Sequence, residues 1–276
     1  MDVPGRPAVR LLAYLLLTLG AIPTALPFLM MASGAVKPLP EIMRIPPTWL
    51  PEQIRWENFA ELFRQFPFGR YFANSVIVAA VVVTSALVVS AMAGYAFSKF
   101  RFPGRDLLFI AMLASLMVPF QVRMIPLYLM SMRFGLVDTL PGVIFPWLFD
   151  AFGIFLMRQF MQTIPNDLME AARIDGASEP RIFWTVVLPL VRPALAALAI
   201  FVVVANWEEF LWPLIISTSD RSRTLPVGLH SFADQYMTFV HWQMAGAMIA
   251  IVPLVVAFFL FQRQFIQGIA LTGMKQ

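Results

Sequence analysis

Six long apolar runs constrain this chain more than any other feature. A helix needs about 20 mainly apolar residues to cross a bilayer, and only helices or closed barrels satisfy their backbone polar groups there. The runs therefore predict an all-α, polytopic membrane protein with six transmembrane helices, forming a single domain over residues 1–276. The predicted spans are residues 11–33, 71–97, 107–132, 140–157, 194–216 and 244–261.

Composition supports this class. The chain has 276 residues, of which 59% are hydrophobic and 13% charged, whereas a soluble domain averages about 25% charged residues. It contains no cysteine, which excludes disulfides, thiolate catalysis and cysteine-ligated metals. Residues 32–35 read as a cleavable site, but the first apolar run is longer than the roughly 7–15 residues of a signal peptide. We therefore expect the first run to be a retained span.

Basic residues in the short loops predict the orientation. Three of them, Lys99, Arg101 and Arg105, lie between the second and third runs, whereas the next short loop, residues 133–139, has only Arg133. Because short loops rich in Lys and Arg stay inside, we expect residues 98–106 and both termini to be cytoplasmic. Six spans then place residues 164–189 on the same side.

The loop from residue 34 to residue 71 is expected to begin extended, because it is rich in proline. Apolar residues at helical spacing between Phe59 and Phe66 then predict an amphipathic helix. Two placements stay open. The helix can lie in the membrane interface with Trp49 and Trp56 at headgroup depth, or it can pack on its own bundle.

Residues 164–189 form a hydrophilic interruption between the fourth and fifth runs. Pro165 suits a first helical position, and Asp167 and Glu170 suit the first turns, where a carboxylate favours the positive end of the helix dipole. Gly176 can supply the left-handed residue that ends the helix, and Ser178 can cap a second one. The stretch therefore predicts a short helix, a glycine turn and a second helix.

Side-chain spacing adds detail to this stretch. Arg173 lies three residues after Glu170 and is expected to pair with it, while Pro189 and Pro193 are expected to end the second helix. Small alanines on one helix face allow another protein to approach closely; the alternative is an amphipathic connector packed on its own bundle. The residues that share this face are Leu168, Ala171, Ala172 and Asp175.

The sequence Glu170-Ala171-Ala172, with Gly176 and Leu188-Pro189 at fixed distances, resembles the EAA motif of binding-protein-dependent ABC importers. Only Val186 departs, since the family usually has isoleucine there. The resemblance implies that residues 164–189 carry a cytoplasmic coupling helix between spans four and five. In the family this helix docks on a separate ATPase and transmits its closure to the pore; the implied coupling residues are Glu170, Ala171, Ala172, Asp175, Gly176, Leu188 and Pro189.

The likeness extends over nearly the whole chain. The chain resembles the smaller carbohydrate-type permease subunit, as in maltose or glycerol-3-phosphate importers. The likeness includes residues 56–59, 95–97, 102–105 and 125–128, and a closing tail at residues 268–275 that is implied to reach toward the ATPase. Glu208 and Glu209 replace an Asn-Asp pair, so no role is carried over to them. Implied partners are a second homologous permease, a cytoplasmic ATPase dimer and an extracytoplasmic substrate-binding protein, in a bacterial or archaeal cytoplasmic membrane.

No catalytic motif is present. The sequence lacks a GxxxxGK[ST] phosphate loop, an HExxH zinc motif and a GxSxG nucleophile elbow. We therefore expect no catalysis and no cofactor in this chain, with ATP and Mg²⁺ bound by the partner ATPase.

Polar groups inside apolar runs usually face a cavity, because burying them in lipid is costly, and aromatic rings can stack on sugar faces. Pairing with the partner permease is the alternative for the two glutamates. The resulting candidates for the substrate path are Gln121, Trp147, Asp150, Asn206, Trp207, Glu208 and Glu209, with Phe149 and Trp212 as further stacking candidates.

The favoured function is a permease subunit of an ATP-driven importer for a sugar or polyol. The first alternative is a proton-coupled secondary transporter that uses Asp150, Glu208 and Glu209, but the two repeated halves typical of that class are not found. The second is a membrane enzyme that uses Glu208 and Glu209 as acid and base, and no motif supports it.

Overall fold

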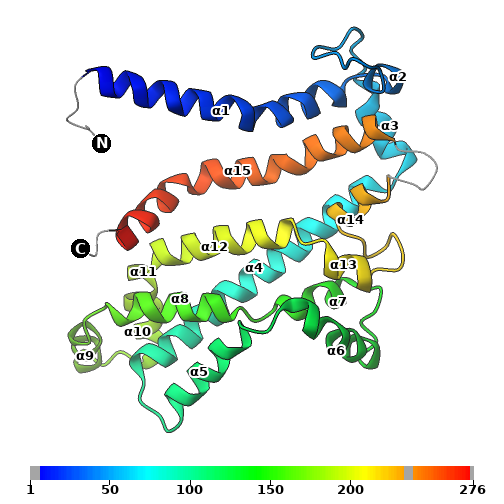
Figure 1. Ribbon diagram of the computed structural model, residues 1–276. Coiled ribbons are helices and arrows are strands. Elements are labelled where there is room, and N and C mark those ends of the chain that lie inside the picture. The colour runs from blue at the N-terminus through cyan, green and yellow to red at the C-terminus, as the bar shows by residue number, and fades with distance from the viewer. Residues whose placement is uncertain (1–6, 233–238, 274–276) are drawn as a thin grey trace. The chain divides into compact units, whose positions relative to one another are not determined.

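The computed structural model describes residues 7–232 and 239–273, and every regular element within these ranges is a helix (Figure 1). The all-α prediction is confirmed. The closing tail extends past this part of the chain, since residues 274–276 lie outside it. The chain divides into two compact units, Met1–Phe68 with Gly228–Val252, and Gly69–Val227 with Pro253–Gln276.

Within the described residues, three helices are long and apolar enough to cross a membrane: Leu11–Ala35 within α1 (Pro7–Ala35), α4 (Phe68–Lys99) and Val240–Phe259 within α15 (Val240–Gly273). The same part of the chain offers three further spans only as bent pairs. The segment α5 (Arg105–Ser115) plus α6 (Phe120–Arg133) bends by 99°, Leu140–Trp147 plus α8 (Ala151–Gln162) by 44°, and Glu179–Leu190 plus α12 (Arg192–Trp207) by 77°. The sequence thus located the apolar runs and, through Pro119 and Pro126, a break in the third. The breaks in the other two bent spans were not predicted.

The predicted fifth span, residues 194–216, is wrong as one continuous helix. Helix α12 ends at Trp207, and α13 (Leu211–Ile216) starts anew after a break. The Glu209 carboxylate accepts a hydrogen bond from the Trp212 backbone N–H at 3.1 Å, so it caps the new helix start. In the third run, Pro119 occupies the N-cap of α6 and separates it from α5.

In the first unit, α3 (Glu57–Gln65) is the predicted amphipathic helix. Leu62 is fully buried and the Phe66 ring lies 4.2 Å from that of Phe232, so this face packs inside its own unit. Trp49 and Trp56 remain exposed. Two other short helices are α2 (Leu39–Ile42) and α14 (Leu225–His230).

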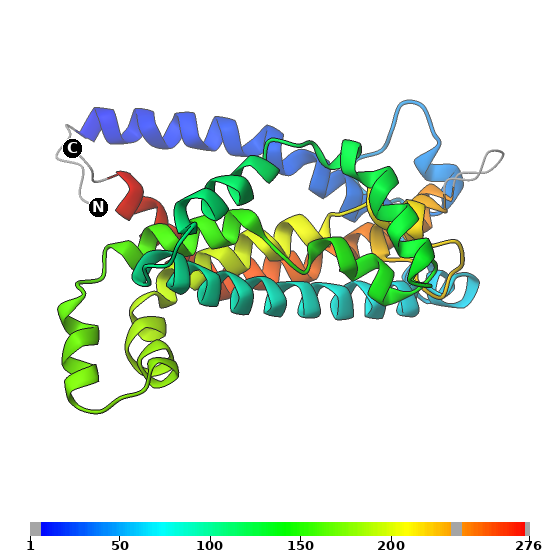
Figure 2. The same ribbon diagram turned by 90° about the horizontal axis from the view of Figure 1, so that it is seen from below.

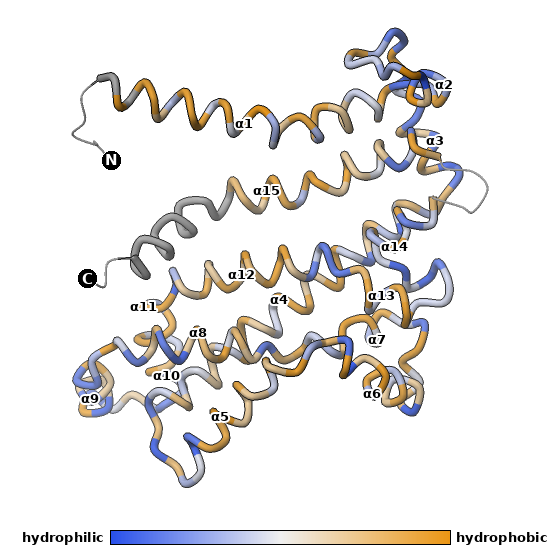
Figure 3. The backbone as a smooth tube through the Cα atoms, viewed as in Figure 1, coloured by the Kyte–Doolittle hydropathy of each residue, from blue (hydrophilic) through white to orange (hydrophobic). Residues whose placement is uncertain are grey.

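Large apolar side chains are exposed along several helices. Leu17 on α1 is 69% exposed and Leu107 on α5 is 72% exposed, and Figure 3 shows hydrophobic residues over most of α1. Exposed apolar surface on this scale marks contact with lipid or another protein, which agrees with a membrane-embedded chain.

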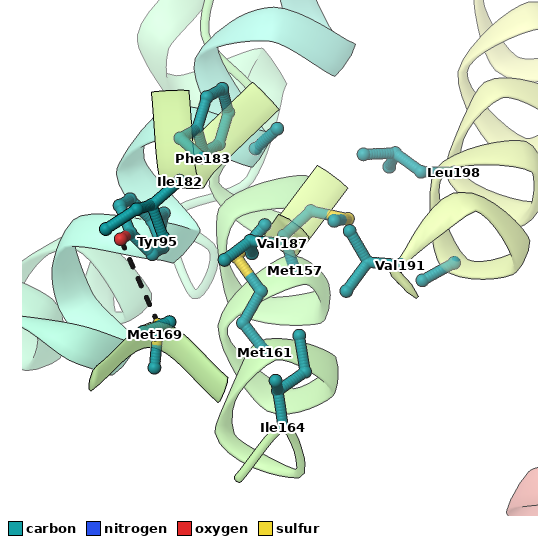
Figure 4. Packing of buried hydrophobic residues seen from close by; sticks show 12 residues of the cluster. Tyr95, Met157, Met161, Ile164, Met169, Ile182, Phe183, Val187, Val191 and Leu198 are labelled. Carbon is teal, nitrogen blue, oxygen red and sulfur yellow. Dashed lines mark hydrogen bonds between the residues drawn. The ribbon is translucent and has the colours of Figure 1, made fainter. Parts of the chain in front are cut away.

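In the second unit, α8 packs against α5 and against α12. Close approach between α4 and α8 depends on Gly94, because a Cβ there would lie 2.7 Å from the Met157 Cβ and 3.0 Å from the Arg158 backbone nitrogen. Gly94 thus lets the two helices approach closely, as small residues do between transmembrane helices. A buried cluster that includes Met157 and Tyr95 fills the space beside this contact (Figure 4).

Asp138 joins two loops of the second unit. It adopts a left-handed conformation with φ 59°, and its carboxylate accepts hydrogen bonds from the Ser219 N–H at 2.9 Å and the Ser222 hydroxyl at 2.6 Å. Hydrogen bonds from the hydroxyls of Ser219, at 2.7 Å, and Ser222 lower the pKa of Asp138 to about 2. The loop before α7 (Leu140–Ile144) is therefore fastened to the loop after α13.

Candidate functional site

The stretch 164–189 folds as the predicted helix, glycine turn and second helix. Helix α9 (Asp167–Ile174) is followed by Gly176 with φ 81° and by α10 (Glu179–Ile182). Figure 2 shows α9 and α10 projecting from the other helices of the second unit. Pro165 is not the first helical residue as predicted, since the helix begins two residues later. Ser178 occupies the N-cap position without a side-chain capping bond.

The expected pair between Arg173 and Glu170 is wrong. Arg173 Nε instead donates to Glu179 Oε1 at 2.6 Å, because the turn at Gly176 folds the chain back and brings Glu179 within reach. Pro189 also does not end the second helix. Phe183–Val187 form a π-helix (η2), and Pro189 lies inside the following α11 (Leu188–Leu190).

The faces of α9 differ sharply. Met169 is 2% exposed and belongs to the buried cluster, whereas Leu168 is 46% and Ile174 is 86% exposed. One face is thus packed on the chain itself, while the other presents apolar and polar groups to its surroundings. Of the implied coupling residues, Glu170, Ala171, Asp175 and Gly176 are exposed, and Ala172, Leu188 and Pro189 are half-buried.

Hydrogen bonds attach this stretch to the end of α4. The Tyr95 hydroxyl donates to Glu179 Oε2 at 3.0 Å and lies 4.0 Å from the Met169 sulfur (Figure 4). Lys99 Nζ donates to the Ile164 carbonyl at 2.6 Å and to Asn166 Oδ1 at 3.0 Å. These contacts hold the stretch on both sides of α9. Tyr95 and Lys99 were not predicted to take part in this attachment. The signal that could have identified them is a hydroxyl and an ammonium group at the end of an apolar run.

A cavity of about 410 Å³ in the second unit brings together four of the seven substrate-path candidates, Trp147, Asp150, Asn206 and Glu209. They come from η1 (Phe145–Trp147), the start of α8, the end of α12 and the break after it. The volume lies within the range of about 300–1,000 Å³ typical of small-molecule sites. Residues distant in sequence thus converge on one cavity.

The other candidates lie elsewhere. The Trp207 ring is buried 5.8 Å from that of Phe72, and Gln121 and Glu208 are exposed outside the cavity lining. Trp212 is fully buried and donates its Nε1–H to the Gly142 carbonyl at 3.0 Å, so it supports the fold rather than the cavity. The predicted ring of Phe149 lines the cavity.

Two further rings that line the cavity, those of Phe152 and Phe201, were not predicted. Neither is directly next to a polar residue in the sequence. Within the described ranges, 7–232 and 239–273, no cluster of three or more His, Asp or Glu side chains is placed to hold a metal ion.

Comparison with known proteins places the chain in a family. Residues 86–271 match the family described as binding-protein-dependent transport system inner membrane component. The chain belongs to this family. It is therefore a multi-pass membrane component of a transport system, as its apolar helices indicate.

Curated relatives in the family match along almost their full length. The arabinooligosaccharides transport system permease protein AraQ of Halalkalibacterium halodurans is 37% identical over 267 residues, covering 94% of this chain and 96% of that protein. The lactose permease protein LacG of Rhizobium radiobacter is 35% identical, covering 92% and 93%. The sn-glycerol-3-phosphate permease protein UgpE of Yersinia pestis is 30% identical, covering 97% and 98%.

A solved structure shares the fold. The chain superposes with a TM-score of 0.82 and 22% identity, over 95% of this chain and 99% of the other, on a bacterial ABC transporter involved in the import of the acidic polysaccharide alginate. The relatives named here are transport-system permease proteins, which gives no support to the proton-coupled or the enzymatic interpretation.

Proposed function

We propose that this chain is the permease subunit of an ATP-driven importer for a sugar or related polyol, and that α9 is its coupling helix. The observation that carries the proposal is the exposed face of α9, which bears Glu170 and Ala171, on a stretch that is fastened to α4 through Tyr95 and Lys99. Family membership supports it, as do the permease relatives.

The proposal includes an orientation and partners. All 276 residues form one permease domain with six spans, three of them bent, and with α9 and both ends in the cytoplasm. A second homologous permease completes the path, a cytoplasmic ATPase dimer binds ATP and Mg²⁺, and an extracytoplasmic protein delivers the substrate. A solved complex that shares the fold, with a TM-score of 0.64, contains a periplasmic protein with bound alginate pentasaccharide.

In this mechanism the chain carries out no catalysis. Closure of the ATPase dimer displaces α9, and the contacts of Glu179 and Asn166 pass that displacement to α4. Because α4 also lines the cavity through Val82 and Ala86, the movement alters the cavity's access to either side. Substrate therefore crosses as the helices rearrange.

The test is a charge reversal on the exposed face. Glu170→Lys is expected to leave insertion and fold intact, because the side chain is exposed, but to abolish sugar-dependent stimulation of ATP hydrolysis and uptake in the reconstituted complex. Glu57→Lys, another exposed glutamate in a first helical turn, is the matched control and should behave as wild type. Normal uptake in Glu170→Lys, or purification without any ATPase, would contradict the proposal.

A further inference from the structure

The charged residues that line the cavity are both acidic. Asp150 and Glu209 contribute carboxylates and Asn206 contributes an amide, while no Lys, Arg or His is among the lining residues that the structure describes. The rest of the described lining is apolar and consists of four aromatic and four aliphatic side chains, Trp147, Phe149, Phe152, Phe201, Val82, Ala86, Val202 and Ala205. Such a lining offers acceptors for hydroxyl groups and flat apolar faces, but no positive charge to balance an anion.

Each carboxylate already accepts from backbone N–H groups at a helix start, and Asp150 has the Gly153 N–H as a partner besides that of Phe152. Asp150 Oδ1 accepts from the Phe152 N–H at 3.1 Å, and Glu209 Oε1 accepts from the Trp212 N–H at 3.1 Å. These bonds fix both side chains beside the cavity. An ionised carboxylate has about four lone-pair sites, so those that the backbone N–H groups leave open can accept from a bound hydroxyl group.

We propose that this cavity binds an uncharged sugar ring and discriminates against an anionic one. The inference rests on the proposed function in taking the ligand to be a carbohydrate. Sugar hydroxyls donate to Asp150, Glu209 and the Asn206 amide oxygen, while the rings contact the apolar faces of the sugar. A single carboxylate about 5 Å from a bound anion, at an effective dielectric constant of about 20, weakens binding on the order of 100-fold.

The fold alone does not set this preference. By their names, one relative belongs to a transport system for lactose and another to one for sn-glycerol-3-phosphate, and the superposable structure imports an acidic polysaccharide. Neutral and anionic substrates are thus both found among proteins of this architecture. The discrimination must come from local side chains, and in this chain they are the acids of the cavity.

The test measures binding to the complex as purified, in nanodiscs and without the extracytoplasmic protein, so that the selectivity recorded is that of the membrane cavity. The probes are maltotriose and trigalacturonate in equilibrium dialysis. Wild type is expected to bind maltotriose on the order of 100-fold more tightly than trigalacturonate. In the double variant Asp150→Asn, Glu209→Gln, each amide oxygen can still cap its helix, but the charged acceptors of the sugar hydroxyls are lost. Maltotriose binding should therefore weaken, trigalacturonate should gain at least about tenfold, and the ratio of the two affinities should fall.

Glu208→Gln is the matched control, because it removes a neighbouring carboxylate that is exposed outside the cavity lining; it should leave both affinities unchanged. Equal binding of both probes by wild type, an unchanged ratio in the double variant, or no binding of either probe at millimolar concentration would overturn the inference. Failure of the proposed function shows separately, since Glu170→Lys is read by ATP-driven uptake and this experiment by binding alone.

Discussion

Tyr95→Phe tests whether the 164–189 stretch is mechanically fastened to α4. The change removes one hydroxyl group and keeps the ring, which is 6% exposed and lies between Phe100 at 5.2 Å and Phe183 at 5.4 Å. The change removes the hydrogen bond from the hydroxyl to Glu179 Oε2 at 3.0 Å and the weaker contact with the Met169 sulfur at 4.0 Å. Packing is therefore almost unchanged, and the effect isolates the contacts of one hydroxyl group.

The expected magnitude follows from the surroundings of Glu179. A hydrogen bond to a charged group contributes about 1.5–3 kcal/mol. The carboxylate is partly exposed and keeps its bond from Arg173 at 2.6 Å, so water and Arg173 compensate and the lower end, about 1.5 kcal/mol, applies. That corresponds to about a tenfold larger population in which the stretch is detached from α4.

Hydrogen exchange of the chain in nanodiscs measures this population. Amides of α9 and α10 should exchange about tenfold faster in Tyr95→Phe, while those of α12 stay unchanged, and more ATP should be hydrolysed per sugar imported. Tyr128→Phe on α6 is the matched control and should alter neither reading. Unchanged exchange in α9, or an equal rise throughout the chain, would refute the reasoning.

Three further substitutions test local features. Gly94→Ala should lower the free energy of unfolding by about 1–3 kcal/mol, seen as a lower midpoint in thermal unfolding, because the added Cβ would meet Met157 at 2.7 Å; Gly20→Ala, with nothing within 4 Å, should not. Gly176→Val places a β-branched residue at φ 81° and should cost about 1–3 kcal/mol, loosening α9 in hydrogen exchange. Because hydrogen bonds lower the pKa of Asp138 to about 2, the loop contacts are stabilised above about pH 4 and should weaken as pH falls toward 2, which hydrogen exchange of residues 218–222 measures. Asp138→Asn, which tolerates positive φ, should remove that pH dependence. A profile that stays unchanged in the variant would contradict this prediction.

Local sequence signals predicted the 164–189 stretch well, because helix ends and a glycine turn are set by neighbouring residues. Asp167 and Glu170 occupy the first turn of α9, and Gly176 adopts positive φ, as expected. One error arose where a contact crossed the turn, and others concerned helix ends, since Pro165 precedes α9 and Pro189 lies inside α11. Spacing favours Arg173 with Glu170, but the reversal at Gly176 offers Glu179 instead.

Composition located the apolar runs and Pro119 signalled the break in the third, but the break in the fifth run and the cavity depend on tertiary structure. Glu209 reads as one polar residue in an apolar run, and only its capping of α13 reveals a helix break. Asp150 is more than fifty residues away in sequence, and no periodicity could place it beside Asn206. Equally polar Glu208 and Gln121 lie outside that cavity lining, so polarity in an apolar run selected candidates without distinguishing among them.

The break between α12 and α13 separates two pairs of packed helices, which can therefore move relative to each other. Helix α12 packs against α8, whereas α13 packs against α7 and is joined to it by the hydrogen bond from Trp212 to Gly142. Of the cavity residues, Asn206 belongs to the first pair, and Trp147 directly follows α7 of the second pair. A rotation of one pair relative to the other changes the shape of the cavity between them. Because such coupling is reciprocal, a molecule bound in the cavity changes the equilibrium of that rotation by the same free energy.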